Sequence, residues 1–330
     1  MENRSNKNRH RYWARDGHHL RLNDLKQVNS HVNKYLFKEN IPAYPQPEFQ
    51  VCRLKHDTCG EGLRGIKMDE GFRDPSEDSL VWWSLSVGPE EIKSAETRLL
   101  EEKYEERTEE QVAMQQSFLW KFATSPAFLE TSRLGSYRFT FPLEELLTAY
   151  SEQFCSGQPP VMRVKETDLY KQEVVHVVLV HSSANQEKFS EYPLLTDDPN
   201  AVCVYRNGCF IWRPEAMSET HRFELIHRDE EMQMEAQPVF NHQFYVWDNV
   251  VIALHVENGQ VLKFNVDQLR ENLKFCGEGY PPVKSGLYFD SFEDAKDKVE
   301  KLWPDGRSPL EKEHSLKESF TDQTAANAPI

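Results

Sequence analysis

One stretch of the chain, residues 49–91, encloses a histidine in a setting suited to chemistry. Its first residues, FQVCRL, alternate apolar and polar side chains, which predicts a half-buried strand. His56 follows at the exit of this strand, and Gly60 and Gly62 form a turn after it. A histidine side chain can exchange a proton near neutral pH. His56 is therefore a candidate catalytic residue.

A carboxylate lies at the start of another predicted strand, much later in the chain. Glu173 opens the run EVVHVVLVH, whose β-branched residues predict a central strand. Tyr170 precedes it by three residues. Glu173 is therefore the second candidate for a catalytic side chain.

The spacing of apolar residues between His56 and Glu173 predicts a helix and a strand. A short amphipathic helix is predicted up to Gly71, and residues 80–87 form a second strand that contains Trp82 and Trp83. Adjacent strand residues point to opposite faces, so we expect one tryptophan in the core and the other on a groove wall or a domain contact.

This order of segments resembles the ADP-ribosyltransferase fold shared by poly-ADP-ribose polymerases, the RNA 2'-phosphotransferase and bacterial toxins. The resemblance covers about residues 49–181 and consists of a strand, His-x-Thr, a short helix, Gly-Phe, a strand and a late glutamate. The matching residues are His56-Asp57-Thr58, Leu63, Ile66, Gly71-Phe72, Trp82-Trp83-Ser84 and the segment from Leu169-Tyr170 to Glu173-Val174-Val175.

The resemblance implies a site that binds NAD as a substrate and needs no metal. In it, Glu173 would stabilise the oxocarbenium-like state as nicotinamide departs, because a carboxylate near developing positive charge lowers that barrier. His56 would hold a ribose or the adenylate portion of NAD. The NAD-binding residues implied in this way are His56, Thr58, Trp82, Trp83, Ser84 and Tyr170.

The chain also departs from the family patterns. The polymerases have a tyrosine on the second strand, where this sequence has tryptophans. The arginine-specific class could use Arg53 with Ser84, but it has Glu or Gln two residues before its catalytic glutamate, and Lys171 stands there. Whether the protein is an enzyme, and which acceptor it modifies, therefore stay open. The alternative is a non-catalytic protein-interaction module, a pseudoenzyme whose aromatic-lined groove binds a protein partner.

Composition bounds the remaining classes. The chain has 330 residues, 38% of them hydrophobic, which suggests roughly two domains. A net charge of -15 argues against nucleic acid as a partner. No apolar run is long enough for a membrane span or a secretory signal, so we expect an intracellular, cytoplasmic protein. The six cysteines are sparse and are expected to be free thiols.

Other kinds of site find no support in the sequence. Four histidines of the second half, at positions 221, 227, 242 and 255, lack metal-ligand spacing, so no metal site is expected. The motifs G-x-S-x-G, the P-loop and G-x-G-x-x-G do not occur, which disfavours hydrolases, kinases and Rossmann dehydrogenases.

The predicted fold class is α+β, with mixed and antiparallel sheets and flanking helices in two units. Residues 1–22 are expected to be a mobile basic arm, and residues 23–183 the ADP-ribosyltransferase-like domain. Residues 187–304 form a second α+β domain with C-terminal helices and two β-hairpins, one around Asn207-Gly208 and one around residues 257–260. Residues 305–330 are expected to be disordered.

Overall fold

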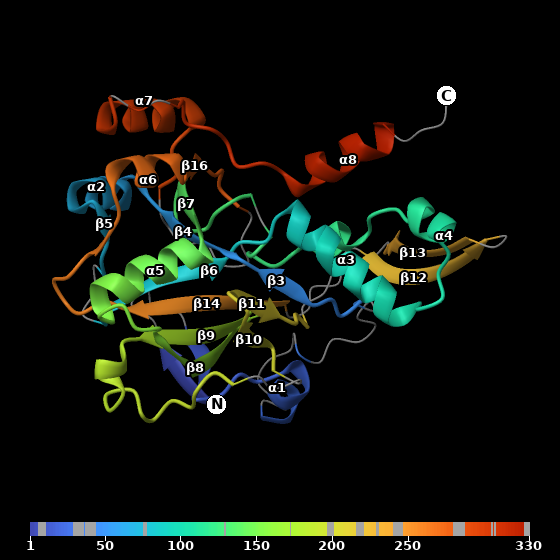
Figure 1. Cartoon of the computed structure of the whole chain (residues 1–330), viewed down its shortest axis with the longest axis horizontal. Coiled ribbons are helices and arrows are strands. Elements are labelled where there is room, and N and C mark those ends of the chain that lie inside the picture. The colour runs from blue at the N-terminus through green and yellow to red at the C-terminus, as the bar shows by residue number, and fades with distance from the viewer. Residues whose placement is uncertain are drawn as a thin grey trace.

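The fold is α+β, as predicted, and is built on one large mixed sheet (Figure 1). The computed structural model describes residues 1–5, 11–28, 36, 44–74, 78–128, 130–171, 173–196, 201–215, 221–228, 231–239, 247–279, 288–304, 306 and 308–326. Within these ranges, the large sheet has nine strands. Their order is β1 (Glu2–Ser5), β2 (Arg11–Asp16), β8 (Val161–Tyr170), β9 (Glu173–His181), β14 (Trp247–His255), β6 (Leu80–Leu85), β4 (Arg53–Thr58), β7 (Tyr137–Pro142) and β16 (Leu273–Phe275).

Strand β14 occupies the centre of this sheet. It pairs in parallel with β9 and antiparallel with β6, so a strand from the second half of the chain lies between two strands of the first half. The predicted boundary at residues 183–187 therefore does not separate two sheets. Sequence pattern alone could not reveal this, because a valine-rich strand carries no signal for its neighbours.

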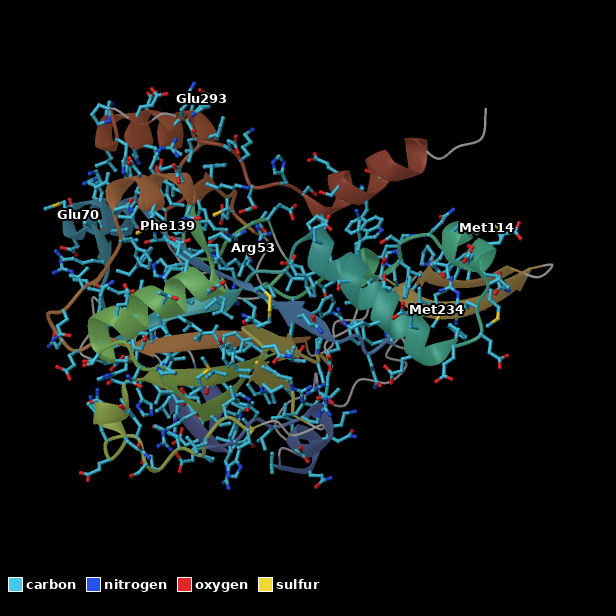
Figure 2. All side chains as sticks on the ribbon, in the orientation of Figure 1. Arg53, Glu70, Met114, Phe139, Met234 and Glu293 are labelled. Carbon is cyan, nitrogen blue, oxygen red and sulfur yellow. A yellow bond between two sulfur atoms is a disulfide. The ribbon has the colours of Figure 1, made fainter. Side chains whose placement is uncertain are left out.

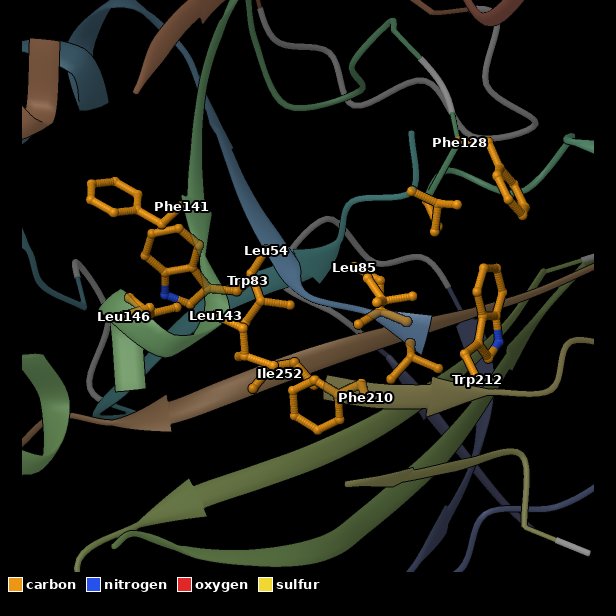
Figure 3. Packing of buried hydrophobic residues seen from close by; sticks show 14 of the residues in the cluster. Leu54, Trp83, Leu85, Phe128, Phe141, Leu143, Leu146, Phe210, Trp212 and Ile252 are labelled. Atoms are coloured by element: carbon orange, nitrogen blue, oxygen red, sulfur yellow. The ribbon is translucent and has the colours of Figure 1, made fainter. Parts of the chain in front are cut away.

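The sheet has two faces with different environments. The register places Trp83 opposite Ile252, Ile252 opposite Val178, and Leu54 opposite Leu85, so these side chains share one face. We call it the helix-covered face, because α2 (Gly60–Asp69) and α5 (Leu143–Phe154) pack on it (Figures 1 and 3). We call the other side the opposite face.

Helix α5 shows how the sequence builds this packing. Leu143, Leu146, Leu147 and Tyr150 follow helical spacing and are buried, while Glu144 sits in the first turn. Figure 3 shows two of these leucines beside the aromatic core of the sheet. Burial of this stripe holds α5 across the strands.

Smaller sheets flank the large one. Their strands are β3 (Phe49–Val51) with β11 (Cys209–Trp212) and β10 (Cys203–Arg206), β12 (His221–Arg228) with β13 (Glu231–Pro238), and β5 (Gly71–Phe72) with β15 (Leu262–Lys263). The predicted strand over residues 49–54 thus divides at Cys52 between two sheets.

The hairpin predicted at Asn207-Gly208 is confirmed, with β10 and β11 antiparallel and both turn residues at positive φ. The second predicted hairpin is wrong. After residues 257–260, β15 pairs with β5 and not with β14, because Leu262 packs against the Phe72 cluster beside α2. The described residues hold another hairpin, β12–β13, that was not predicted.

The remaining helices lie around the sheets. They are α1 (Leu22–Val28), α3 (Pro89–Lys103), α4 (Glu109–Met114), η1 (Leu119–Phe122), η2 (Ser183–Asn185), α6 (Val266–Glu271), α7 (Phe292–Leu302) and α8 (Leu316–Ala326). The helical spacing of Leu25, Val28, Val32 and Leu36 predicts a helix over residues 23–37; α1 confirms its start, and residues 29–35 and 37 lie outside the described residues. No helix in the described part of the chain is long and apolar enough to cross a membrane.

Neither end of the chain behaves as predicted. The basic arm forms β1 and β2 at the edge of the large sheet, and Arg4 forms ion pairs with Asp16 and Glu166. At the other end, α8 packs on the core through Phe320, whose ring stacks on Trp120. Both segments have a polar composition, which predicted disorder. Their order comes from a few specific tertiary contacts, and composition does not reveal such contacts.

The expectation of free thiols is wrong for two cysteines. Cys52 and Cys209 form a disulfide with a Cα–Cα distance of 4.7 Å, shown as a yellow bond near Arg53 in Figure 2. They face each other because Val51 pairs with Phe210 in the β3–β11 ladder. Cys203, on the other strand of the β10–β11 hairpin, is a buried free thiol. The partner of Cys52 is 157 residues away, and only the tertiary pairing reveals it.

Candidate functional site

His56 lies on β4 in an aromatic environment on the helix-covered face. Its Nδ1–H donates to the carbonyl of Trp82 over 2.8 Å, and its ring lies 5.1 Å from Phe72 and 5.5 Å from Trp83. Burial lowers the pKa of His56, although the Trp82 carbonyl opposes this. The ring is therefore neutral near pH 7 and holds β4 to β6.

Glu173 is the first residue of β9 and is buried. Both of its carboxylate oxygens accept hydrogen bonds from Arg133, at 2.6 Å from Nη1 and 2.8 Å from Nη2. Burial alone would lower the pKa of Arg133, but Glu173 outweighs it and raises that pKa. The positive charge of Arg133, which lies in the segment before β7, thus balances the negative charge of Glu173.

The two candidate catalytic residues do not share a cleft. His56 is two residues from Leu54 and lies with it on the helix-covered face. Glu173 is an odd number of residues before Val178, so its side chain lies on the opposite face. The nine-stranded sheet separates the two groups, and the register of β4, β6, β14 and β9 is the reason.

The other residues implied by the resemblance divide in the same way. Trp83 is 1% exposed on the helix-covered face, which confirms that one of the two tryptophans lies in the core. Trp82 is 39% exposed on the opposite face, and its expected role as a groove wall or a domain contact stays a prediction. Thr58 lies two residues after His56, on the same face of β4, and packs against Gly62 of α2. The fit is close, because a Cβ on residue 62 would lie 2.0 Å from the threonine hydroxyl oxygen. Ser84 and Tyr170 accompany Glu173 on the opposite face; Tyr170 lies directly across from Glu173.

A buried charged network occupies the opposite face beside β4. Arg138 holds both oxygens of Asp57 at 2.7 and 2.8 Å. Burial alone would raise the pKa of Asp57, but Arg138 lowers it below its usual value. The Lys55 ammonium donates to the carbonyl of Pro126 over 2.6 Å, and burial, with Arg138 adding to it, lowers the pKa of Lys55 to about 7.

This network ties the segment before β7 to the sheet, and the sequence offered no signal for it. Arg133 and Arg138 stand in no motif, and each meets its carboxylate only through tertiary contacts. Charged residues on strands are ordinarily solvated, so nothing in the sequence indicates that Lys55 and Asp57 belong to a buried network. Each of these charges has a partner, which makes the network a structural feature.

A large open groove lies elsewhere, between α5, the start of β8 and the β10–β11 hairpin. Its volume is about 1180 Å³, and the Cys52–Cys209 disulfide forms part of its wall. The remaining lining residues are Pro142, Glu144, Leu147, Thr148, Ser151, Glu152, Gly157, Pro159, Pro160, Val161, Met162, Leu194, Leu195, Thr196, Tyr205, Asn207 and Gly208.

The groove combines exposed apolar side chains with negative charge. Leu194 and Tyr205 are large apolar residues that lie exposed within it. Burial, and then the nearby Glu144 carboxylate, raise the pKa of Tyr205. Its described lining contains Glu144 and Glu152 but no lysine, arginine or histidine.

No protein-family model, curated protein or solved structure matches this chain. The assignment of function therefore depends on the geometry alone. Across the described ranges, no group of three or more His, Cys, Asp or Glu is arranged to hold a metal ion.

Proposed function

We propose that this protein is a non-catalytic interaction module, and that its groove binds a segment of a partner protein with basic and apolar side chains. The observation that carries this proposal is the composition of the groove, in which exposed apolar residues and two glutamates surround a large open space. Exposed apolar patches rimmed by polar residues are typical of protein-interaction sites.

The size of the groove favours a peptide segment over a small molecule. Small-molecule sites are usually enclosed cavities of about 300–1,000 Å³ that surround their ligand. This groove is larger, at about 1180 Å³, and opens to solvent along the exposed residues Pro159, Leu194 and Tyr205. Several residues of an extended chain fit such a space.

Charge selects the kind of segment. Glu144 and Glu152 project from α5 into a groove whose described lining carries no positive side chain. The whole chain has a net charge of -15, which repels acidic partners and attracts basic ones. Lysine or arginine beside an apolar anchor is therefore the expected recognition element.

The positions of the candidate catalytic residues also favour binding over chemistry. A transferase that used Glu173 and His56 together would need both at one bound dinucleotide, and they lie on opposite faces of the sheet. Arg133 already occupies both oxygens of Glu173. Inside the groove, Ser151 is engaged as a donor to the Gln158 carbonyl.

The test is a peptide-display selection on the full-length oxidised protein, followed by measurement of Kd for the enriched peptides. We expect enrichment of Lys or Arg flanking Leu, Phe or Trp. Leu194→Glu should weaken binding by at least about tenfold, which is ~1.4 kcal/mol. Leu134→Glu is the matched control, because Leu134 is 54% exposed and Leu194 is 53% exposed, but only Leu194 lines the groove.

Two results would overturn the proposal. One is that no peptide is enriched, or that enriched peptides bind Leu194→Glu as well as wild type. The other is thermal stabilisation by NAD with release of nicotinamide, both lost in Glu173→Gln, which would support ADP-ribosyl transfer instead. The charge argument has its own check, since Glu144→Lys should weaken the same peptides and Glu102→Lys on α3 should not.

A further inference from the structure

A second, smaller cavity lies between α2, α6 and the end of α7. Its volume is about 170 Å³, and its lining includes Lys67, Arg270, Trp303, Gly306 and Ser308. None of these residues belongs to the groove described above. We call this cavity the Arg270 pocket.

Arg270 is a buried cation that forms no ion pair with a carboxylate of the described residues. It is only 8% exposed, and one guanidinium nitrogen donates to the carbonyl of Ser308. Burial lowers the pKa of Arg270, and the nearby Glu311 only partly opposes this. Buried charges are ordinarily paired, since an isolated one loses its hydration without compensation.

Trp303, another residue that lines the pocket, has a donor without an acceptor among the described residues. Trp303 is buried, and its indole Nε1 has no hydrogen-bond partner among the residues that the structure describes. The Lys67 ammonium lies 5.5 Å from the centroid of the Trp303 ring and adds another positive charge. Buried polar groups without partners are rare in folded proteins, so this indole N–H beside a buried cation without an ion pair among the described residues points to a missing ligand.

Gly306 keeps space open beside these groups. A Cβ at this position would lie 3.5 Å from Arg270 Nε and 3.0 Å from the Trp303 carbonyl oxygen. Asp267 and Glu271 also line the pocket, and both are exposed, whereas Arg270 and Trp303 are buried. Among the described lining residues, these two buried side chains therefore contribute donors and a positive charge.

We propose that the Arg270 pocket binds an oxyanion, as a free phosphate or carboxylate or as the end group of a larger molecule. A guanidinium presents parallel N–H groups that match the oxygens of either anion, and the indole N–H and the Lys67 ammonium supply further donors. The small volume limits the bound portion to one such group, because whole drug-sized ligands need about 300 Å³ or more.

The experiment uses the full chain and titrates inorganic phosphate, sulfate and acetate against a sodium chloride reference at constant ionic strength. Two readouts are followed: the thermal midpoint and the indole N–H signals of the seven tryptophans in an NMR spectrum. We expect a saturable rise of the midpoint with at least one oxyanion, and a shift of the single indole signal that is missing in Trp303→Phe.

The variants keep the fold and remove one donor each. Trp303→Phe preserves the ring and removes the N–H, and Lys67→Gln removes the charge; each should weaken oxyanion binding by about tenfold. Arg64→Gln is the matched control, because Arg64 is exposed on the same helix and does not line the pocket. Preference for acetate over phosphate and sulfate would identify the ligand as a carboxylate, and the reverse preference would identify a tetrahedral anion.

The proposal fails if every oxyanion acts no differently from chloride at equal ionic strength. It also fails if Trp303→Phe and Lys67→Gln bind as wild type does. Neither outcome depends on peptide binding at the groove, so the two proposals can be judged separately.

Discussion

Arg133 holds Glu173 through both carboxylate oxygens, with N–O distances of 2.6 and 2.8 Å. The pair joins the segment before β7 to the first residue of β9, and Glu173 is buried beneath it. A bidentate, mostly buried pair of this kind fixes both side chains. Any reaction that used this carboxylate would first have to break it.

Replacement of Glu173 by Gln should therefore reduce stability. Loss of the negative charge leaves the largely buried guanidinium of Arg133 unpaired, which costs several kcal/mol in fully buried pairs and about 2–4 kcal/mol here because Arg133 is partly exposed. Urea denaturation measures the loss. The double variant Glu173→Gln/Arg133→Met should recover part of it, and a change below ~0.5 kcal/mol in the single variant would show that the pair is not structural.

Lys55 should make stability depend on pH. Its pKa is lowered from 10.5 to about 7 by burial, so between these values the unfolded state binds a proton that the folded state does not. The contribution of Lys55 to stability therefore rises with pH across this window. We expect Lys55→Met to have a higher free energy of unfolding than wild type near pH 6. This difference should shrink by about 2 kcal/mol between about pH 6 and about pH 9. The exposed Lys301→Met is the control, and a parallel pH profile for Lys55→Met would contradict the expectation.

The Cys52–Cys209 disulfide should contribute measurably to stability. Cross-links of this kind typically stabilise by about 2–4 kcal/mol, and this one closes a long loop. Cys52→Ser should lower the free energy of unfolding by that amount, and a dithiol reductant should lower that of wild type similarly. Cys59→Ser replaces a free thiol and should change little. Equal stability of wild type with and without reductant would count against the disulfide.

Asp168 should behave in the opposite way to Lys55. Burial, and then the neighbouring Glu166, raise the pKa of Asp168 to about 7, and one of its oxygens has no hydrogen-bond partner among the described residues. The folded state thus retains a proton that the unfolded state has released, and stability falls as pH rises from about 4 to about 7. The free energy of unfolding of Asp168→Asn should exceed that of wild type by about 1–3 kcal/mol near pH 8, and this difference should disappear near pH 4. The exposed Asp297→Asn, which should show no such trend, is the comparison; a flat difference for Asp168→Asn would refute the expectation.

Local features of the fold could be predicted where short-range chemistry determines them. The Asn207-Gly208 turn and the division of Trp82 and Trp83 between the two faces of a strand follow from neighbouring residues, although which tryptophan is buried does not. Pairing between distant strands could not be predicted in this way. The contact of β3 with β11 created the disulfide, and the register through β6, β14 and β9 placed His56 and Glu173 on opposite faces of the sheet.

The binding surfaces were harder still to foresee. The groove brings together α5, residues 194–196 and the β10–β11 hairpin, none of which carries a motif. The Arg270 pocket depends on one glycine and on an indole nitrogen without an acceptor. Both are properties of assembled side chains, and a sequence pattern records only the elements that carry them.

The late strand β14 has a consequence for how the chain must be made. Strands β6 and β9 have been synthesised before residues 247–255 leave the ribosome, yet each needs that strand as its neighbour. Until then both present unpaired backbone edges and apolar side chains, which are the features that recruit other chains. A nascent chain that stalled near residue 183 would be a template for aggregation. Correct folding therefore depends on protecting the unpaired edges of β6 and β9 until β14 has been synthesised.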